Sequence, residues 1–187
     1  MNQNLIFLSN FLKNPKEVAA IAQSSRYVIG RIVKNMDFSN AKNIVEFGPG
    51  TGIVTRSILS KMNESSNLVC FESNADFCSF LAKDISDPRL KVINDSAERL
   101  DFHLKSLEIK NADYILSGIP FSLIGQKSKQ SILLKTHKAL AQDGKFIVYQ
   151  QYNWHMGKHL KDHFENVSMQ IELRNMPPTF IFVCSKK

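Results

Sequence analysis

Three glycines at alternate positions carry the clearest chemical signal in the sequence. Gly48, Gly50 and Gly52 directly follow a strand-like run, 42–47. Glycines in such a turn adopt conformations that other residues avoid, and they let a ligand approach the main chain. A dinucleotide-binding turn would place its third glycine where Ile53 stands, and no Lys-Ser/Thr pair follows as in a P-loop. The turn therefore predicts a nucleotide-type ligand bound in neither of these ways.

Two carboxylates accompany the glycine turn. Glu72 ends the next strand-like run, 67–72, where a carboxylate can accept hydrogen bonds from both hydroxyls of an adenosine ribose. A solvated loop acid is the alternative for Glu72 alone, and the joint pattern disfavours it. Glu46 enters the turn, where an acid is costly unless it meets a cation or hydrogen-bond donors.

A histidine series is the other chemical pattern. His155, His159 and His163 recur every four residues and would share one helix face, a spacing also found in zinc sites. No Glu follows His155 directly, and Gly157 weakens the helix. We therefore expect a solvated or phosphate-facing stripe and no metal site.

The elements that must position these residues alternate between strand and helix from residue 42 onward, which predicts a mostly parallel sheet. The runs 167–173 and 179–184 are joined too closely for a parallel crossover, so they predict a C-terminal antiparallel hairpin. One or two helices precede the sheet. We expect strands at 42–47, 67–72, 90–93, 112–117 and 144–149, and helices at 5–13, 15–35, 53–62, 75–83 and 126–140.

Length and composition indicate one soluble domain over 1–187, with a helical segment at 1–40 and an α/β core at 41–187. The longest apolar runs are about five residues, far short of a membrane span. Residues 1–4 carry no basic charge, so we expect no secretory signal. The three cysteines lack CxxC spacing and read as reduced thiols of a cytoplasmic protein.

The net charge of +7 is unevenly distributed along the chain. Residues 1–40 and 126–187 carry +3 and +6, whereas residues 41–125 carry −2. Basic ends attract anionic partners, either a phospholipid surface or nucleic acid, although solubility alone is an equal explanation. The apolar segments 5–8 and 11–12, followed by lysines, can lie at an anionic membrane surface or pack as a lid on their own domain.

An open parallel sheet that ends in an antiparallel hairpin resembles the class I S-adenosylmethionine-dependent methyltransferases, which have a Rossmann-like fold with helices on both faces. The glycine turn and its two carboxylates resemble the first two motifs of that class. The resemblance implies an enzyme that uses S-adenosylmethionine, whose sulfonium and amino group would supply positive charge near Glu46. The implied cofactor residues are Glu46, Gly48, Pro49, Gly50, Thr51, Gly52, Glu72, Ser73, Asp95, Ser96 and Ala97.

Four stretches resemble the bacterial phosphatidylethanolamine N-methyltransferases, which are related to the rRNA adenine dimethyltransferases. The stretch 46–55 fits both families. The loop 117–121 (Ser-Gly-Ile-Pro-Phe) is closer to the Ser-Gly-Leu-Pro loop of the lipid enzymes than to the Asn-Leu-Pro-Tyr loop of the RNA enzymes. The turn 175–179 (Asn-Met-Pro-Pro-Thr) resembles the Asn-Leu-Pro-Pro-Ala turn of the lipid enzymes.

The remaining stretch lies near the N-terminus, at 11–15 and 22–26. It resembles the family's Pro-Ser-Ser run before a helix, with Gln23 in place of the proline. The resemblance implies that Ser24 and Ser25 contribute to substrate binding.

One departure concerns the adenine contact. After the third strand the family tends to read Gly-Asp-Ala, and the Asp holds the adenine amino group. With Ala97 and Leu100 in register, Asp95 and Ser96 occupy the first two of these places. Either the acid is shifted by one position, or Ser96 makes a weaker hydrogen bond in its place.

Methyl transfer from a sulfonium needs a neutral nucleophile, alignment and exclusion of water. Pro120 stiffens the loop after the fourth strand, and the carbonyls of Gly118 and Ile119 can accept an amine N–H and direct its lone pair at the methyl group. The catalytic residues implied are Ser117, Gly118, Ile119, Pro120 and Phe121.

Aromatic side chains can stabilise a methylated ammonium. Phe121, Tyr152 and Trp154 are the candidates, and core packing is the alternative for each of them. The leading hypothesis is N-methylation of an amine headgroup, such as phosphatidylethanolamine, by an enzyme peripheral to the inner face of a membrane. The alternatives are an RNA or DNA adenine N6-methyltransferase in which Phe121 stacks on a flipped base, a small-molecule methyltransferase, and a cofactor-binding regulatory protein.

Overall fold

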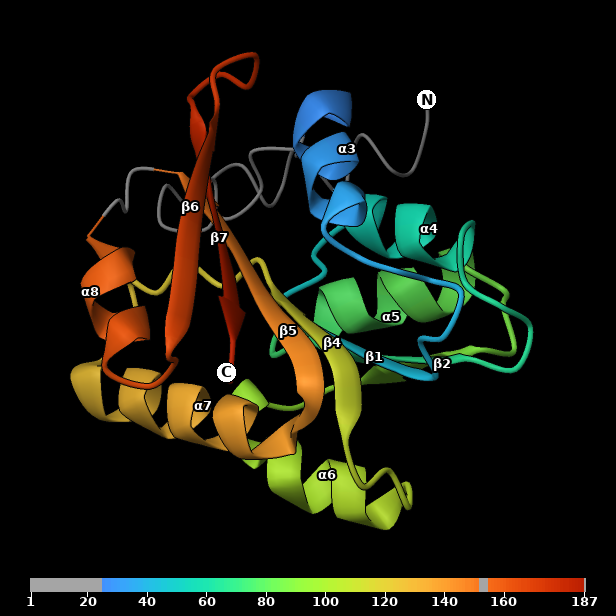
Figure 1. Ribbon diagram of the computed structural model, residues 1–187. Coiled ribbons are helices and arrows are strands. Elements are labelled where there is room, and N and C mark those ends of the chain that lie inside the picture. The colour runs from blue at the N-terminus through green and yellow to red at the C-terminus, as the bar shows by residue number, and fades with distance from the viewer. Residues whose placement is uncertain (1–24, 152–154, 187) are drawn as a thin grey trace.

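One twisted sheet carries the glycine turn and the loop after the fourth strand in the computed structural model, which describes residues 25–151 and 155–186 (Figure 1). In that part of the chain seven strands pair in the order β3-β2-β1-β4-β5-β7-β6. The strands are β1 (Asn43–Phe47), β2 (Asn67–Phe71), β3 (Leu90–Ile93), β4 (Ala112–Ser117), β5 (Leu140–Gln151), β6 (Asn166–Glu172) and β7 (Thr179–Ser185).

Strands β1 to β5 are parallel, and β7 pairs antiparallel with both β5 and β6. The predicted parallel sheet with a C-terminal antiparallel hairpin is confirmed. The strand order reverses between β1 and β4, and open α/β sheets bind ligands at the carboxyl ends of strands at such a point. The turn between β6 and β7 lies at the same sheet edge, because Thr179 pairs with Gln151 at the end of β5.

Helices cover both faces of the sheet, as Figure 1 shows. Alternation along β1 explains the two layers, because successive side chains point to opposite faces. Val45 and Phe47 join a buried cluster with residues of α6, α7 and α8, whereas Ile44 joins a second cluster with residues of α3 and α4. The helices are α3 (Arg26–Lys34), α4 (Ile53–Leu59), α5 (Ala75–Asp84), α6 (Leu100–Ser106), α7 (Gln126–Ala139) and α8 (Met156–Lys161).

Most predicted elements from residue 26 onward are confirmed, with shifted ends. Strand β5 begins at Leu140 instead of residue 144, since Leu140 already pairs with Ala112. Helix α8 and the pair formed by α6 and the short 3₁₀ helix η1 (Ala97–Arg99) were not predicted. The predicted helix 15–35 overlaps the described residues only in α3, and the predicted helix 5–13 lies outside them. In the part of the chain that the structure describes, no helix is both long and apolar enough to cross a membrane.

The glycine turn is anchored to both neighbouring strands. The N–H of Gly48 donates to the carbonyl of Phe71 at the end of β2 (2.9 Å), and the N–H of Gly118 donates to the carbonyl of Phe47 (2.9 Å). Gly52 begins α4 with a φ of +78°, in the left-handed region that favours glycine. A Cβ at Gly52 would lie 2.5 Å from Leu81 Cδ2. The left-handed φ therefore favours glycine at this position, and a side chain there would also displace Leu81 of α5.

We predict that Gly52→Ala lowers the free energy of unfolding by about 2–4 kcal/mol, from left-handed strain and overpacking together. Gly30→Ala is the matched control, because a Cβ there meets nothing within 4 Å inside α3. The control should be neutral or stabilising by up to about 1 kcal/mol. Urea denaturation of both variants measures the difference, and equal stabilities would contradict the packing argument.

Candidate active site

A cavity of about 510 Å³ opens at the carboxyl ends of β1, β2 and β4. It brings together many predicted site residues, namely Gly48, Gly50, Glu72, Ser73, Asp95, Ser96, Ala97, Gly118, Ile119 and Pro120. Sequence reasoning missed the other lining residues, Phe71, Asn74, Phe77, Glu98, Ile124, Gly125, Ser128 and Ile132. Several of these come from the first turns of α5 and α7, whose starts the sequence did mark.

The glycine turn forms one wall of the cavity through its main chain. Gly48 and Gly50 have φ values of +65° and +56°. A Cβ at Gly50 would meet no atom within 4 Å, so the space beside it is open to a ligand. Pro49, Thr51 and Gly52 are not among the lining residues; Gly52 instead supports α4. The turn therefore presents main chain, free of side chains, to whatever occupies the cavity.

Glu72 is almost fully buried at the cavity wall. Its carboxylate accepts hydrogen bonds from the N–H groups of Gly50 (3.2 Å) and Asn74 (2.9 Å). Burial raises the pKa of Glu72 above its ordinary value, and the N–H groups of Asn74, Gly50 and Ser73 offset part of that shift. A carboxylate has about four acceptor positions, so the geometry leaves capacity for a ribose diol.

Glu46 lies elsewhere: it is fully buried and is not among the cavity residues. Alternation along β1 turns it toward α4, where its carboxylate accepts from the hydroxyl of Thr55 (2.7 Å) and contacts Cys70 Sγ (3.6 Å). The Tyr149 hydroxyl lies 3.4 Å from its other oxygen. Burial raises the pKa of Glu46 to about 7, against the opposing effect of these three donors. An acid at this position needs either a cation or hydrogen-bond donors, and Glu46 meets donors.

Asp95 and Ser96 both line the cavity. They follow β3, whereas the loop that contacts the glycine turn follows β4, on the other side of β1. The Asp95 carboxylate contacts His103 Nε2 (2.8 Å) and Arg99 Nε (3.0 Å), and these partners hold its pKa below the usual range. The Ser96 hydroxyl accepts from the Glu98 N–H (3.2 Å) and so begins η1. The carboxylate is the stronger acceptor of the two and is held in position by its partners.

The loop after β4 approaches the glycine turn so closely that Gly118 is required. A Cβ at Gly118 would lie 2.8 Å from the Tyr149 hydroxyl and 3.0 Å from the carbonyl oxygen of Gly48. The buried Ser117 hydroxyl accepts from the Ile119 N–H (3.3 Å). These contacts fix the loop whose carbonyls are predicted to receive the amine.

Phe121 is placed differently from the prediction. Its side chain is fully buried in the core cluster and is not among the cavity residues. The Leu123 N–H donates to the carbonyl of Pro120 (2.8 Å) and closes a turn. This turn leaves Phe121 on the core side. Phe121 therefore packs in the core, which is the alternative that the sequence analysis gave for it.

The predicted substrate-binding residues are described only in part. Ser25 begins α3, and its N–H donates to Asn175 Oδ1 in the β6–β7 turn (2.9 Å). It does not line the cavity. Ser24, Tyr152, Trp154 and the apolar segments 5–8 and 11–12 lie outside the described residues.

The three histidines of the series are spread along α8. His155 occupies the N-cap position, His159 lies within the helix, and His163 follows its end. Within residues 25–151 and 155–186, no three His, Cys, Asp or Glu side chains lie close enough to hold a metal ion.

Comparison with known proteins decides the family. The family model described as "Ribosomal RNA adenine dimethylase" matches residues 1–151. The chain belongs to this family. Among curated relatives, an ornithine lipid N-methyltransferase from Singulisphaera acidiphila is 25% identical over 185 residues, covering 98% of this chain and 96% of the relative. Ribosomal RNA small subunit methyltransferase A from Mesomycoplasma hyopneumoniae is 31% identical over 112 residues, covering 60% of this chain and 36% of that enzyme.

Solved structures share the fold of this dimethylase-family chain. A precorrin-6y C5,15-methyltransferase from Geobacter metallireducens superposes with a TM-score of 0.70 at 12% identity, covering 89% of this chain and 92% of that one. A 1,6-didemethyltoxoflavin-N1-methyltransferase from Burkholderia thailandensis, solved with S-adenosylhomocysteine, gives 0.69 at 14% identity, covering 97% and 86%. Family and fold together make the chain an S-adenosylmethionine-dependent methyltransferase with a Rossmann-like fold.

The cavity of this methyltransferase fits the cofactor on its own geometry. Gly50 leaves open space beside bare main chain, and Glu72 offers a buried carboxylate with spare acceptor capacity. When bound, S-adenosylmethionine supplies a methyl group on a positively charged sulfur. Phe71, Ile119 and Ile132 give the cavity apolar surface that excludes water, and the loop after β4 lines the same cavity through Gly118, Ile119 and Pro120.

We predict that Glu72→Ala weakens S-adenosylhomocysteine binding about tenfold to a hundredfold, because charged hydrogen bonds to the ribose are lost. Asp76→Ala is the matched control, since Asp76 is an exposed carboxylate in the first turn of α5, the helix that follows Glu72, and does not line the cavity. Calorimetry on both folded variants provides the comparison. Unchanged affinity in Glu72→Ala would place the ribose elsewhere.

Glu46 gives a pH prediction. Its folded pKa of about 7 exceeds the ordinary value of 4.5, so the folded protein retains a proton that the unfolded chain releases. The group's contribution to stability is therefore fully present below about pH 4.5 and is lost as the pH rises through 7. We expect Glu46→Gln to become more stable relative to the parent between pH 5 and pH 8, by up to about 3 kcal/mol. Denaturation at both pH values tests this, with the exposed Glu64→Gln as control; a difference independent of pH would refute it.

Proposed function

We propose that this methyltransferase transfers a methyl group to the primary amine in the headgroup of a membrane lipid. The supporting observation is the placement of Phe121. An adenine-modifying enzyme with this loop would stack Phe121 on the flipped base, and here the side chain is buried in the core away from the cavity. Gly118 and Ile119 of the same loop line the cavity, where their main-chain carbonyls can accept from the N–H groups of an amine.

The relatives support the same proposal through the length that they share with this chain. The similarity to the ornithine lipid N-methyltransferase runs over nearly the whole of both proteins and includes the C-terminal hairpin. The similarity to the ribosomal RNA enzyme spans about a third of that enzyme's length. An ornithine headgroup and phosphatidylethanolamine both present a primary amine near an acidic group, so one site can recognise either.

The cavity has the surface that such an acceptor requires. Beyond the polar end formed by Glu72 and Asp95, its lining near the β4 loop includes Ile119, Ile124 and Ile132. Apolar walls keep water from the reacting nitrogen, and they favour its neutral form, which carries the lone pair needed for attack. The acceptor carbonyls of Gly118 and Ile119 then hold the remaining N–H groups.

We predict that purified full-length protein transfers labelled methyl from S-adenosylmethionine to micellar lipid and leaves total RNA unlabelled. Separate micelles of ornithine lipid and phosphatidylethanolamine identify the headgroup, and phosphatidylcholine, which has no N–H, is the negative control. Gly118→Ala should reduce kcat at least about tenfold by displacing the loop, and so assigns the activity to this site. Label in RNA and none in either amine lipid would refute the proposal.

A further inference from the structure

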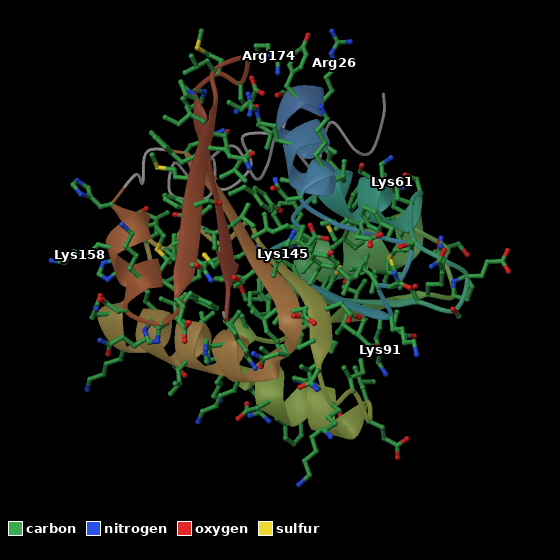
Figure 2. The ribbon with its side chains drawn as sticks, viewed as in Figure 1. Arg26, Lys61, Lys91, Lys145, Lys158 and Arg174 are labelled. Atoms are coloured by element: carbon green, nitrogen blue, oxygen red, sulfur yellow. The ribbon has the colours of Figure 1, made fainter. Side chains whose placement is uncertain are left out.

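A surface of mixed character lies at the end of the molecule formed by the β6–β7 turn and the start of α3. Leu173 and Met176 are 75% and 94% exposed, more than any other large apolar side chain among the described residues. Arg174 directly follows Leu173, and Figure 2 shows Arg26 and Arg174 at the same end of the molecule. We call these four residues the hairpin-tip surface.

The arginines of this surface are held in place by a defined network. Buried Glu172 accepts from Arg31 Nε (2.6 Å) and from Arg174 Nε (2.8 Å). The Arg174 guanidinium stacks on the Tyr27 ring at 4.1 Å, and Arg26 lies 4.9 Å from the same ring. One carboxylate thus balances only part of the charge of three arginines, and the tip keeps a net positive charge.

The tip projects from the sheet edge that carries the cavity. Thr179 at the start of β7 pairs with Gln151 at the end of β5, so the β6–β7 turn lies at the carboxyl ends of the parallel strands. The Ser25 N–H bond to Asn175 joins the start of α3 to the same turn. A flat partner that contacts the tip would therefore also face the edge where the cavity opens.

We propose that the hairpin-tip surface docks the enzyme on an anionic phospholipid bilayer, with Leu173 and Met176 inserted among the lipid chains and the arginines at the phosphates. This deepens the proposed function, because it names the surface through which a lipid substrate is approached. Aliphatic side chains gain free energy when they enter hydrocarbon, and arginines gain it at an anionic interface. RNA is recognised through phosphate contacts and base stacking, and the aliphatic side chains of Leu173 and Met176 would contribute to neither.

The test is flotation of the full chain with vesicles of phosphatidylcholine and phosphatidylglycerol. Neither lipid carries a methylatable amine, so binding is measured independently of the proposed reaction. The double variant Leu173→Gln, Met176→Gln should reduce partitioning about tenfold or more, and Arg26→Gln about fivefold at low salt. The matched controls are Leu134→Gln with Phe102→Gln, two exposed apolar side chains on α7 and α6, and Lys91→Gln, a cation that Figure 2 places far from Arg174.

A second measurement separates docking from folding and from catalysis. The double variant should bind S-adenosylhomocysteine normally and methylate the amine lipid in detergent micelles at the parent rate. It should lose methylation of the same amine lipid when that lipid is presented in vesicles. Parent protein that ignores vesicles, or equal losses in tip and control variants, overturns the proposal. A parent dimer that the tip variant converts to monomer also overturns it and makes the surface an interface between copies. If vesicle binding behaves as expected but no amine lipid is methylated, the proposed function fails and the docking surface stands.

Discussion

Close contact between two main-chain turns, those after β1 and β4, is the constraint on which the site depends. A Cβ on Gly118 would lie 3.0 Å from the carbonyl oxygen of Gly48, and the N–H of Gly118 donates to the carbonyl of Phe47. Neighbouring parallel strands set this separation, so the position of Gly118 has no room for a side chain. Both turns also line the cavity, through Gly48 and Gly50 on one and through Gly118, Ile119 and Pro120 on the other.

Behind this contact the protein buries an acid that does not reach the cavity. Thr55, Cys70 and Tyr149 surround Glu46. The Tyr149 hydroxyl also lies 2.8 Å from the position that a Cβ on Gly118 would occupy. Three donors for one carboxylate satisfy its acceptors without cancelling the effect of desolvation on its pKa. The network therefore links β1, which carries the glycine turn, to Tyr149 of β5, which lies beside the loop after β4.

Sequence patterns predicted the sheet, its hairpin and the cavity's glycines and Glu72, because alternation and turn chemistry are local properties. The placement of Phe121 could not be predicted in this way, since a single phenylalanine after a proline suits a cavity wall and a core equally well. Asp95 illustrates the same limit, because its partners Arg99 and His103 lie on η1 and α6, which the sequence patterns did not predict. Leu100 and Leu104, four residues apart after a capping serine, were the signal for them.

The bonds between α3 and the hairpin have a consequence for synthesis on the ribosome. Ser25 bonds to Asn175 and Arg31 to Glu172, so partners from opposite ends of the chain meet across 150 and 141 positions. Ile181 of β7 also belongs to the buried cluster that contains Val28 and Ile32. The apolar face of α3 thus lacks its last partners until the hairpin, 141 to 150 positions further along the chain, has been translated. During that interval the nascent chain exposes a helix face that chaperones can recognise, which makes the order of emergence part of how this fold is reached.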